Sequence, residues 1–139
     1  MHIVVDTSVW SAVLRRRQVD ESDSYVGAFR THLARGDSLL LVGPIIQELL
    51  SGLKRPEDFN RVVEGLNLFP LIPLRRSTYV MAARLSNDCQ RVGVQAGQID
   101  ALIAATCIEG RYPLLTADLD LLRIAKHCEL IVLPPLNKG

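Results

Sequence analysis

Short, continuous apolar runs alternate with longer helical patterns along the chain, and this alternation most constrains what the chain can fold into. The first run, residues 2–5 (His-Ile-Val-Val), is rich in β-branched side chains and has no polar face. Such a run is typical of a strand that is buried on both faces of a sheet. Similar runs occupy residues 39–42, 71–74, 114–116 and 130–133.

Helical patterns fill the segments between these runs. They are expected at residues 8–16, 24–35, 44–53, 56–66, 77–92, 98–109 and 119–127. Pro44 and Pro56 stand where a first helical turn tolerates proline, and Gly36, Gly93 and Gly110 stand where helices end. Because helices separate the strands, parallel strands with helical crossovers are the expected solution, and the sequence predicts an α/β fold.

Length and composition indicate one ordinary globular domain. At about 100–200 residues per domain, 139 residues predict a single domain over residues 1–139. A content of 48% hydrophobic and 22% charged residues excludes a disordered, collagen-like or coiled-coil chain. No segment reaches the roughly 18 apolar residues of a membrane helix, and the first residues lack the basic start and long apolar core of a signal peptide. We therefore expect a cytoplasmic protein without a membrane partner.

The charged residues and cysteines exclude few functions. A formal net charge of +1 gives no sign of general nucleic-acid binding, but it leaves room for a local site. The 16 basic residues are mostly arginine, whose rigid fork suits phosphate, although a GC-rich genome explains this preference equally well. The three cysteines, Cys89, Cys107 and Cys128, form no Cys-x-x-Cys pair, so packing roles are expected in place of zinc binding or a disulfide framework.

Three aspartates directly follow two of the predicted strands. Asp6 comes after residues 2–5, and Asp118 and Asp120 come just after residues 114–116. Ligand sites of open α/β sheets form beyond the carboxyl ends of the strands, so these acids lie at the functional edge. Capping of the following helices is an alternative role for Asp6 and Asp118, and it is compatible with a site.

Asp100 is the most informative acid because its helix is apolar on nearly every side. Between Ile99 and Ile108, Thr106 is the only other polar residue. A helix of this kind is buried, and an unpaired charge inside a protein is very costly. The helix dipole offsets only up to ~1 kcal/mol of that cost. Asp100 therefore needs either a salt bridge or a place in a charged site.

Glu48 is the least distinctive acid. It lies about 130° from the centre of the apolar stripe of its helix, which describes an ordinary solvated glutamate. Its neighbours Pro44, Ser51 and Gly52 are small and leave room for another group to approach.

Common catalytic motifs are missing from the sequence. It contains no glycine-rich phosphate loop and no Gly-x-Ser-x-Gly, and its three histidines are poorly placed for catalysis. Carboxylate and water oxygens are the ligands that hard cations select. An acid set without histidine or cysteine is therefore typical of a Mg²⁺ or Mn²⁺ site.

Four segments carry a resemblance to a known family. They are residues 4–10 (VVDTSVW), 46–50 (IQELL), 98–106 (QIDALIAAT) and 115–120 (LTADLD). In this order and spacing the chain resembles PIN-domain ribonucleases, specifically the VapC-type toxins of bacterial type II toxin–antitoxin systems. The family often has phenylalanine where this chain has Leu121, a difference that concerns packing.

The resemblance implies a PIN-like three-layer α/β/α fold with a five-stranded parallel sheet of order 3-2-1-4-5. It implies the following catalytic and metal-binding acids: Asp6, Glu48, Asp100 and Asp118, with Asp120 as a further candidate ligand. The hydroxyls of Ser8 and Thr116 would orient these acids or a water. The implied cofactor is Mg²⁺ or Mn²⁺, and the implied activity is hydrolysis of RNA phosphodiester bonds.

The resemblance also implies a cognate VapB-type antitoxin, an RNA substrate and a homodimer. The arginines at residues 15–17 or 75–76 could hold RNA phosphates, or they could simply be solvated. Two alternatives to an enzyme are a catalytically silent PIN scaffold and a receiver-like binding module. A receiver would need paired acids after its first strand, an acceptor aspartate after its third and a lysine after its fifth, which this sequence lacks.

Overall fold

The computed structural model describes residues 1–135, so residues 136–139 of the expected domain lie outside the described residues. Its strands are β1 (His2–Val5), β2 (Ser38–Val42), β3 (Leu71–Ile72), β4 (Leu114–Leu115) and β5 (Val132–Leu133). They form one parallel sheet in the order β3-β2-β1-β4-β5. This order confirms the prediction and excludes the receiver-like alternative, whose flavodoxin-like sheet has the order 2-1-3-4-5.

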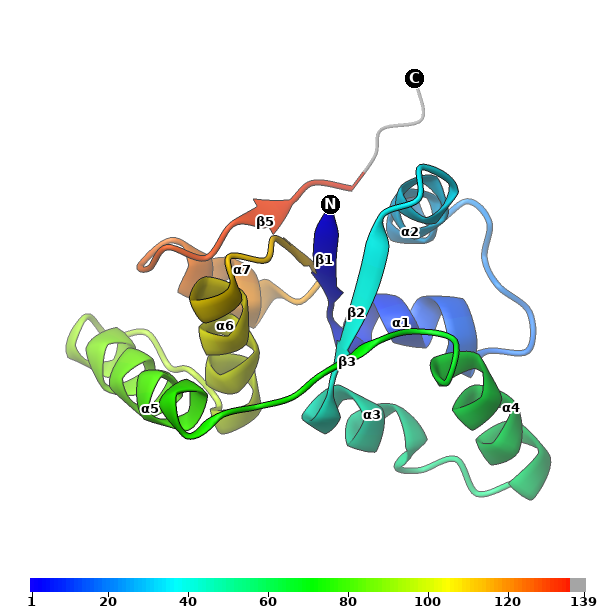
Figure 1. Cartoon of the computed structure of the whole chain (residues 1–139), viewed down its shortest axis with the longest axis horizontal. Helices are drawn as coiled ribbons and strands as arrows, with labels where there is room; N and C mark the ends of the chain where they lie inside the picture. Colours follow the sequence, from blue (N-terminus) through cyan, green and yellow to red (C-terminus); the bar gives the residue numbers. More distant parts are fainter. Residues whose placement is uncertain (136–139) are drawn as a thin grey trace.

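Helices cover the sheet on both sides, which confirms the three-layer α/β/α architecture. The helical elements are α1 (Thr7–Trp10), η1 (Ser11–Arg15), α2 (Ser24–Ala34), α3 (Gly43–Leu50), α4 (Pro56–Leu66), α5 (Arg76–Arg91), α6 (Gln98–Gly110) and α7 (Leu119–Ala125). Figure 1 shows α5 and α6 to the left of β1 and β2, and α1, α2 and α4 to their right. Within residues 1–135, none of these helices has both the length and the apolar character needed to cross a membrane.

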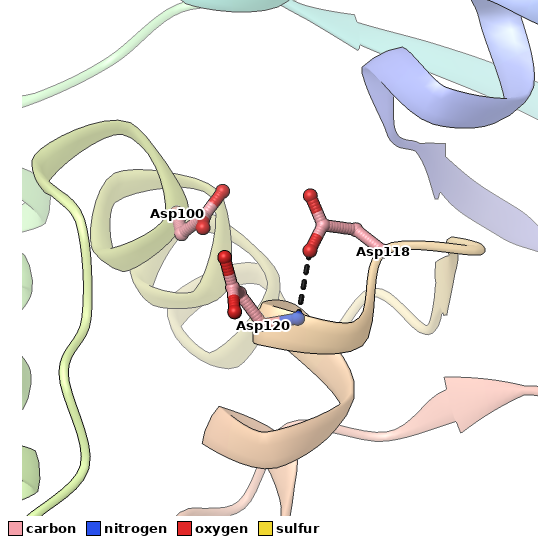
Figure 2. Close-up of side chains that lie close together, drawn as sticks. All are labelled: Asp100, Asp118 and Asp120. Carbon is pink, nitrogen blue, oxygen red and sulfur yellow. Dashed lines mark hydrogen bonds between the residues drawn. The ribbon is translucent and has the colours of Figure 1, made fainter.

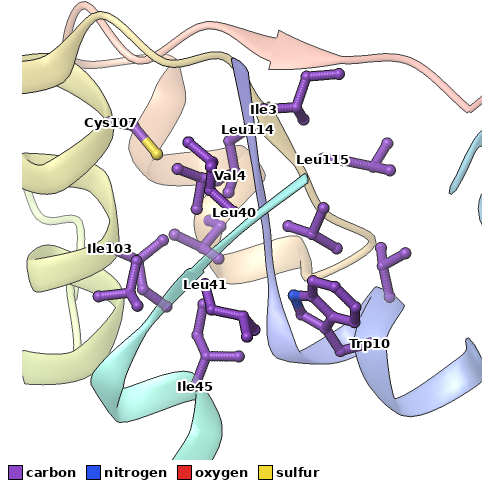
Figure 3. Close-up of a cluster of buried hydrophobic side chains, with 14 of the residues drawn as sticks. Ile3, Val4, Trp10, Leu40, Leu41, Ile45, Ile103, Cys107, Leu114 and Leu115 are labelled. Carbon is purple, nitrogen blue, oxygen red and sulfur yellow. The ribbon is translucent and has the colours of Figure 1, made fainter. Parts of the chain in front are cut away.

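The core lies between the central strands and the helices packed on them. Ile3, Val4, Leu114 and Leu115 are fully buried, as expected for strands that are covered on both faces. Figure 3 shows Val4 and Leu114 on the side of the sheet where Ile103 and Cys107 of α6 lie, and Ile3 and Leu115 on the side of the Trp10 ring.

An aromatic cluster joins the start of the chain to α2 and to the end of α4. The ring of Trp10 meets Phe29 at 5.1 Å and Phe69 at 4.7 Å between centroids, in edge-to-face geometry. Such pairs add about 0.5–1.5 kcal/mol beyond their burial. They fix α1, and with it the residues just before it, against the rest of the fold.

Several strands are shorter than predicted. The expected strand 71–74 ends at Ile72, because Pro73 has no N–H to donate to a neighbouring strand. The expected strand 114–116 ends at Leu115, because Thr116 already belongs to the turn that caps α7. The last strand begins at Val132, whereas the apolar run begins at residue 130.

The helices also differ from their predicted bounds. The first helix, expected over residues 8–16, is one α-turn followed by the π-helical turn η1, a change that the apolar spacing does not distinguish. The helix expected over residues 44–53 ends at Leu50, where Ser51 is extended and Gly52 adopts a φ of +87°. The helix expected over 119–127 ends at Ala125, and the one expected over 77–92 is shifted by one residue.

The three cysteines have free thiols. Cys89 and Cys107 are buried and Cys128 is half-buried, in agreement with packing roles. Burial raises the pKa of the Cys107 and Cys89 thiols, which keeps them protonated and unreactive at neutral pH.

Candidate metal centre

Asp6 lies at the carboxyl end of β1, directly beside the end of β4. The register pairs Val5 with Leu115, so the two residues that follow, Asp6 and Thr116, emerge side by side at one edge of the sheet. Asp6 is only 3% exposed, and its N–H donates to the carbonyl of Leu115 at 2.9 Å. The position of Asp6 is therefore fixed both by the pairing of β1 with β4 and by its own backbone hydrogen bond to Leu115.

All hydrogen bonds to the Asp6 carboxylate go to one of its two oxygens. Oδ2 accepts the Ser8 N–H at 3.3 Å, the Ser8 hydroxyl at 2.8 Å and the Thr116 hydroxyl at 2.8 Å. Hydrogen bonds to a charged acceptor are roughly twice as strong as neutral ones, so the carboxylate orientation is fixed. Among residues 1–135 nothing donates to Oδ1, which stays available for a ligand.

The direction of both hydroxyl hydrogen bonds follows from a second set of contacts. Ser8 Oγ accepts the N–H of Ala117 at 3.0 Å, and Thr116 Oγ1 accepts the N–H of Asp118 at 3.0 Å. Since each hydroxyl already accepts from a backbone N–H, its own hydrogen is free to be donated to Asp6. The network thus fastens the turn after β4 to the turn after β1, and the hydroxyls of Ser8 and Thr116 both contact Asp6.

Asp118 and Asp120 come from the start of α7, and Asp100 faces them from the first turn of α6. Each offers one carboxylate oxygen, and these oxygens all lie within 4.8 Å of one another. Figure 2 shows the three carboxyl groups gathered between α6 and α7. Asp118 Oδ1 also accepts the N–H of Asp120 at 2.7 Å, so Asp118 caps its helix and belongs to the cluster at the same time.

The cluster has little positive charge to balance it. Asp120 pairs with Arg123 at 3.0 Å, one helical turn away on the exposed side of α7. Across residues 1–135 no ion pair reaches Asp6, Glu48, Asp100 or Asp118. Among the described residues, no basic side chain forms the salt bridge that was the alternative role of Asp100.

Among these acids, Asp100 has the pKa that burial and the neighbouring carboxylates raise most clearly. Burial raises its pKa, and the negative charges of Asp118, Asp6, Asp120 and Glu48 raise it further, to about 6. Like-charge repulsion from the other four acids therefore acts on the half-buried Asp100 carboxylate. A positive ion between these acids would relieve that repulsion.

Glu48 faces the same region from α3. Its residue is exposed, as the helical pattern predicts. Partial burial of the carboxyl group raises its pKa first, and the charges of Asp6 and then Asp118 raise it further. The nearby Thr7 hydroxyl lowers that pKa, although Thr7 Oγ1 is buried and completes no hydrogen bond within the described residues. Glu48 thus lies within electrostatic reach of the cluster but outside its tightest group of three.

Sequence reasoning only partly anticipated these residues. Asp120 was expected as a further candidate, yet it is one of the three acids with the closest oxygens. The pairing of Asp120 with Arg123 was missed, although a spacing of three residues on a helix could have indicated it. The unpartnered hydroxyl of Thr7 was also missed as a feature of the site.

A parallel sheet with carboxylates gathered at the ends of its middle strands defines the class: an α/β protein with an acidic site at the edge of the sheet. The sequence model of the PIN domain family matches residues 3–127. The chain therefore belongs to the PIN domain family, and this confirms the family resemblance of its four motifs.

Individual relatives agree with this family assignment. The chain is 29% identical over 124 residues to Ribonuclease VapC1 of Rickettsia felis, covering 84% of each. It is 27% identical over 142 residues to Ribonuclease VapC of Rickettsia bellii, covering 96% of this chain and 98% of that protein. The crystal structure of VapBC2 from Rickettsia felis, bound to a DNA fragment from their promoter, superposes with a TM-score of 0.76 at 18% identity. That match covers 95% of this chain and 97% of the other, and it shows a shared fold.

Proposed function

We propose that this protein is a metal-dependent endoribonuclease, the toxin of a VapBC-type toxin–antitoxin pair, which hydrolyses RNA phosphodiester bonds. The observation that carries the proposal is a set of five carboxylates at one edge of the sheet with a single arginine partner among residues 1–135. The names of the two relatives, both ribonucleases, support the same activity.

The donor set fits a hard divalent cation such as Mg²⁺ or Mn²⁺. The grouped atoms of Asp100, Asp118 and Asp120 are all carboxylate oxygens, which these ions prefer. Oδ1 of Asp6 has no donor among residues 1–135, and the raised pKa of Asp100 reports crowded negative charge. We assign Asp6, Glu48, Asp100 and Asp118 as ligands, with Asp120, whose carboxylate oxygen groups with those of Asp100 and Asp118, as a further ligand. A bound cation would supply charge neutralisation of the phosphate and a water of lowered pKa.

The chain's own residues prepare the site for such a cation. Ser8 and Thr116 hold the Asp6 carboxylate through Oδ2, so Oδ1 keeps one direction without any rearrangement. The Asp118 carboxylate is also held in place, because its Oδ1 accepts the N–H of Asp120 at the start of α7. Asp100 binds a proton more readily than an ordinary aspartate, so cation binding and proton release are coupled at this residue.

The partners follow from the VapC resemblance. We propose a cognate VapB-type antitoxin, a homodimer and an RNA substrate, with one PIN domain over residues 1–139. Apolar side chains on the surface between residues 24 and 68 support a docking helix of the antitoxin: Leu33 is 47% exposed, Phe59 40% and Leu68 80%. An arginine of the antitoxin would find ready acceptors in the acidic cluster.

One experiment tests the activity directly. Antitoxin-free protein is incubated with single-stranded and structured RNAs in EDTA, and then with Mg²⁺ added in excess. We expect cleavage only with Mg²⁺, and none at either condition for Asp6→Asn. Full activity in chelator would contradict the metal mechanism. Tight RNA binding without any cleavage in Mg²⁺ or Mn²⁺ would instead identify a catalytically silent scaffold.

A further inference from the structure

We propose that a basic surface beside the acidic cluster holds the RNA backbone and delivers it to the cluster. This surface, called the basic corner below, joins the end of η1 to the α3–α4 connection and the start of α4. It consists of Arg15, Arg16, Arg17, Lys54, Arg55 and Arg61. The proposal rests on the proposed function, since it names where that substrate is gripped.

Two arginines build the basic corner by binding backbone carbonyls. Arg61 of α4 donates from Nη1 to the carbonyl of Leu14 at 2.6 Å and from Nη2 to the carbonyl of Arg15 at 3.2 Å. Arg15 in turn donates from Nη2 to the carbonyl of Ser51 at 2.9 Å. These contacts close the end of η1 onto α4 and onto the α3–α4 connection, so cations from separate segments become neighbours.

One aspartate lies among the arginines. Asp58 accepts from Arg17 Nε at 2.9 Å and lies 3.7 Å from Arg61 Nη2. The hydrogen bond from Arg17 is the largest effect and lowers the pKa of Asp58. Burial opposes it, and the charges of Arg17, Arg61 and Arg55 lower the pKa further, so that the net shift is downward. Asp58 therefore stays ionised and orders Arg17 and Arg61.

The charge of the basic corner far exceeds what its acids can balance. Its six cations are accompanied by Glu57 and Asp58, which leaves +4, whereas the remaining residues of this +1 chain together carry −3. The side chains of Arg16, Lys54 and Arg55 are exposed and make no hydrogen bond or ion pair within residues 1–135. These three side chains are thus free to bind a ligand of repeated negative charge.

Two short segments, α1 with η1 and the end of α3, link the basic corner to acids of the site. Glu48 lies in the last turn of α3, and Ser51, whose carbonyl accepts from Arg15, directly follows that helix. Asp6 and Arg15 are joined by the nine residues of α1 and η1, about 13 Å of helix. In a duplex the phosphates of one strand rise by ~3.4 Å each along the axis, and an extended single strand spaces them more widely, so a span of about 13 Å corresponds to a few nucleotides at most.

The physical need for such a surface comes from the acids themselves. Crowded carboxylates repel a phosphodiester until a cation is present, so binding energy must come from elsewhere. Exposed arginine and lysine side chains supply it by releasing counterions from the RNA backbone. Two of the three free side chains are arginines, whose planar fork can bind two oxygens of a phosphate at once. The repeated charge of an RNA backbone offers one such group per nucleotide.

The test compares two triple variants of equal charge change. The first is Arg16→Gln with Lys54→Gln and Arg55→Gln. The matched control is Arg35→Gln with Arg84→Gln and Lys126→Gln, which are exposed cations outside the basic corner and without hydrogen-bond or ion-pair partners in residues 1–135. Binding of a single-stranded polyuridine oligonucleotide is measured in EDTA between about 50 and 200 mM salt, with thermal melts to confirm folding.

We expect the first variant to bind more weakly and its slope of log K against log salt to be shallower by about 2, at ~0.7 per phosphate contact. The control should match the wild type. Equal slopes for the two variants would overturn the proposal. Binding of a polyglutamate peptide is measured in parallel, and a first variant that loses this binding while its RNA binding is unchanged would also overturn it.

Cleavage assays separate this proposal from the proposed function. If the wild type cleaves RNA with Mg²⁺ and the slopes are equal, the nuclease assignment stands and the basic corner does not hold the RNA. If the slope changes as expected but no RNA is cleaved with any divalent ion, the basic corner stands and the nuclease assignment fails.

Discussion

The Thr116 hydroxyl donates a 2.8 Å hydrogen bond to Oδ2 of Asp6, between residues that are 110 positions apart in the sequence. The same hydroxyl accepts the N–H of Asp118, so one side chain touches two acids of the candidate metal centre. Each acid is therefore positioned by the segment that carries the other.

Replacing Thr116 by valine tests this coupling. Thr116→Val keeps the shape of the side chain. It removes the hydroxyl that donates to Asp6 and leaves the Asp118 N–H without its acceptor. We expect a loss of about 1–3 kcal/mol in the free energy of unfolding, the usual cost of an unsatisfied buried group. The Mg²⁺ concentration for half-maximal cleavage should rise about 10–100-fold. Denaturant unfolding and metal titrations check both, and Thr116→Ser should stay near the wild type.

Asp100→Asn should abolish cleavage while keeping or raising stability in EDTA. The substitution removes a charge that four other acids crowd, and nothing in residues 1–135 pairs with it. Relief of like-charge repulsion therefore outweighs any lost contact. Thermal melts of the two proteins in EDTA at pH 7 check this. A strongly destabilised variant would mean that Asp100 has a structural partner.

The pH dependence of metal-free stability follows from the raised pKa of Asp100. Its folded pKa of about 6 lies above its ordinary value of 3.8, so the folded state binds more protons than the unfolded state between these values. Stability from this group is therefore fully present below about pH 4 and is lost as the pH rises to about 6, amounting to ~1–3 kcal/mol. Glu48, whose pKa is also raised, acts in the same direction.

The measurement is the difference in unfolding free energy between wild type and Asp100→Asn, followed in EDTA from pH 4 to 7. The difference cancels groups of opposite sign, such as Asp37, whose pKa is lowered by its hydrogen bond with His32. The variant should become relatively more stable as the pH rises. Saturating Mg²⁺ should remove this trend, and a flat difference in EDTA would contradict it.

A glycine pair tests the junction that builds the basic corner. Gly52 has a φ of +87°, and a Cβ there would lie 3.0 Å from Arg15 Nη2. Gly52→Ala should therefore cost about 1–2 kcal/mol of unfolding free energy. Gly43→Ala is the control, because nothing lies within 4 Å of its Cβ position and it begins α3 with helical geometry. Equal unfolding free energies for the two variants would contradict the role of Gly52.

The sequence predicted much of the fold because the strands are buried on both faces. Their continuous apolar runs have few other interpretations, and the acids that follow them had to lie at the carboxyl edge of a parallel sheet. Asp100 could be singled out because a charge in an apolar helix has a cost that must be offset. These inferences rest on local patterns and on the direction of the chain.

Other features depended on register and were not visible in local patterns. The sequence pattern describes Glu48 as a solvated glutamate, and only the resemblance pointed to the site. Its pKa responds to Asp6 and Asp118 because α3 begins directly after β2, beside β1. The tight grouping of Asp120 with Asp100 depends on how α7 packs on α6, and the hydrogen bonds from Arg61 to the last carbonyls of η1 join segments that are far apart in the sequence.

The pairing of β1 with β4 has a further consequence during synthesis of the chain. Asp6 leaves the ribosome early, but the hydroxyl and the carboxylates that complete its surroundings come from residues 100–120. Contacts of such large sequence separation form late in folding. A nascent or truncated chain that lacks β4 therefore carries no complete acidic cluster, and the site is assembled only once nearly the whole chain has been made.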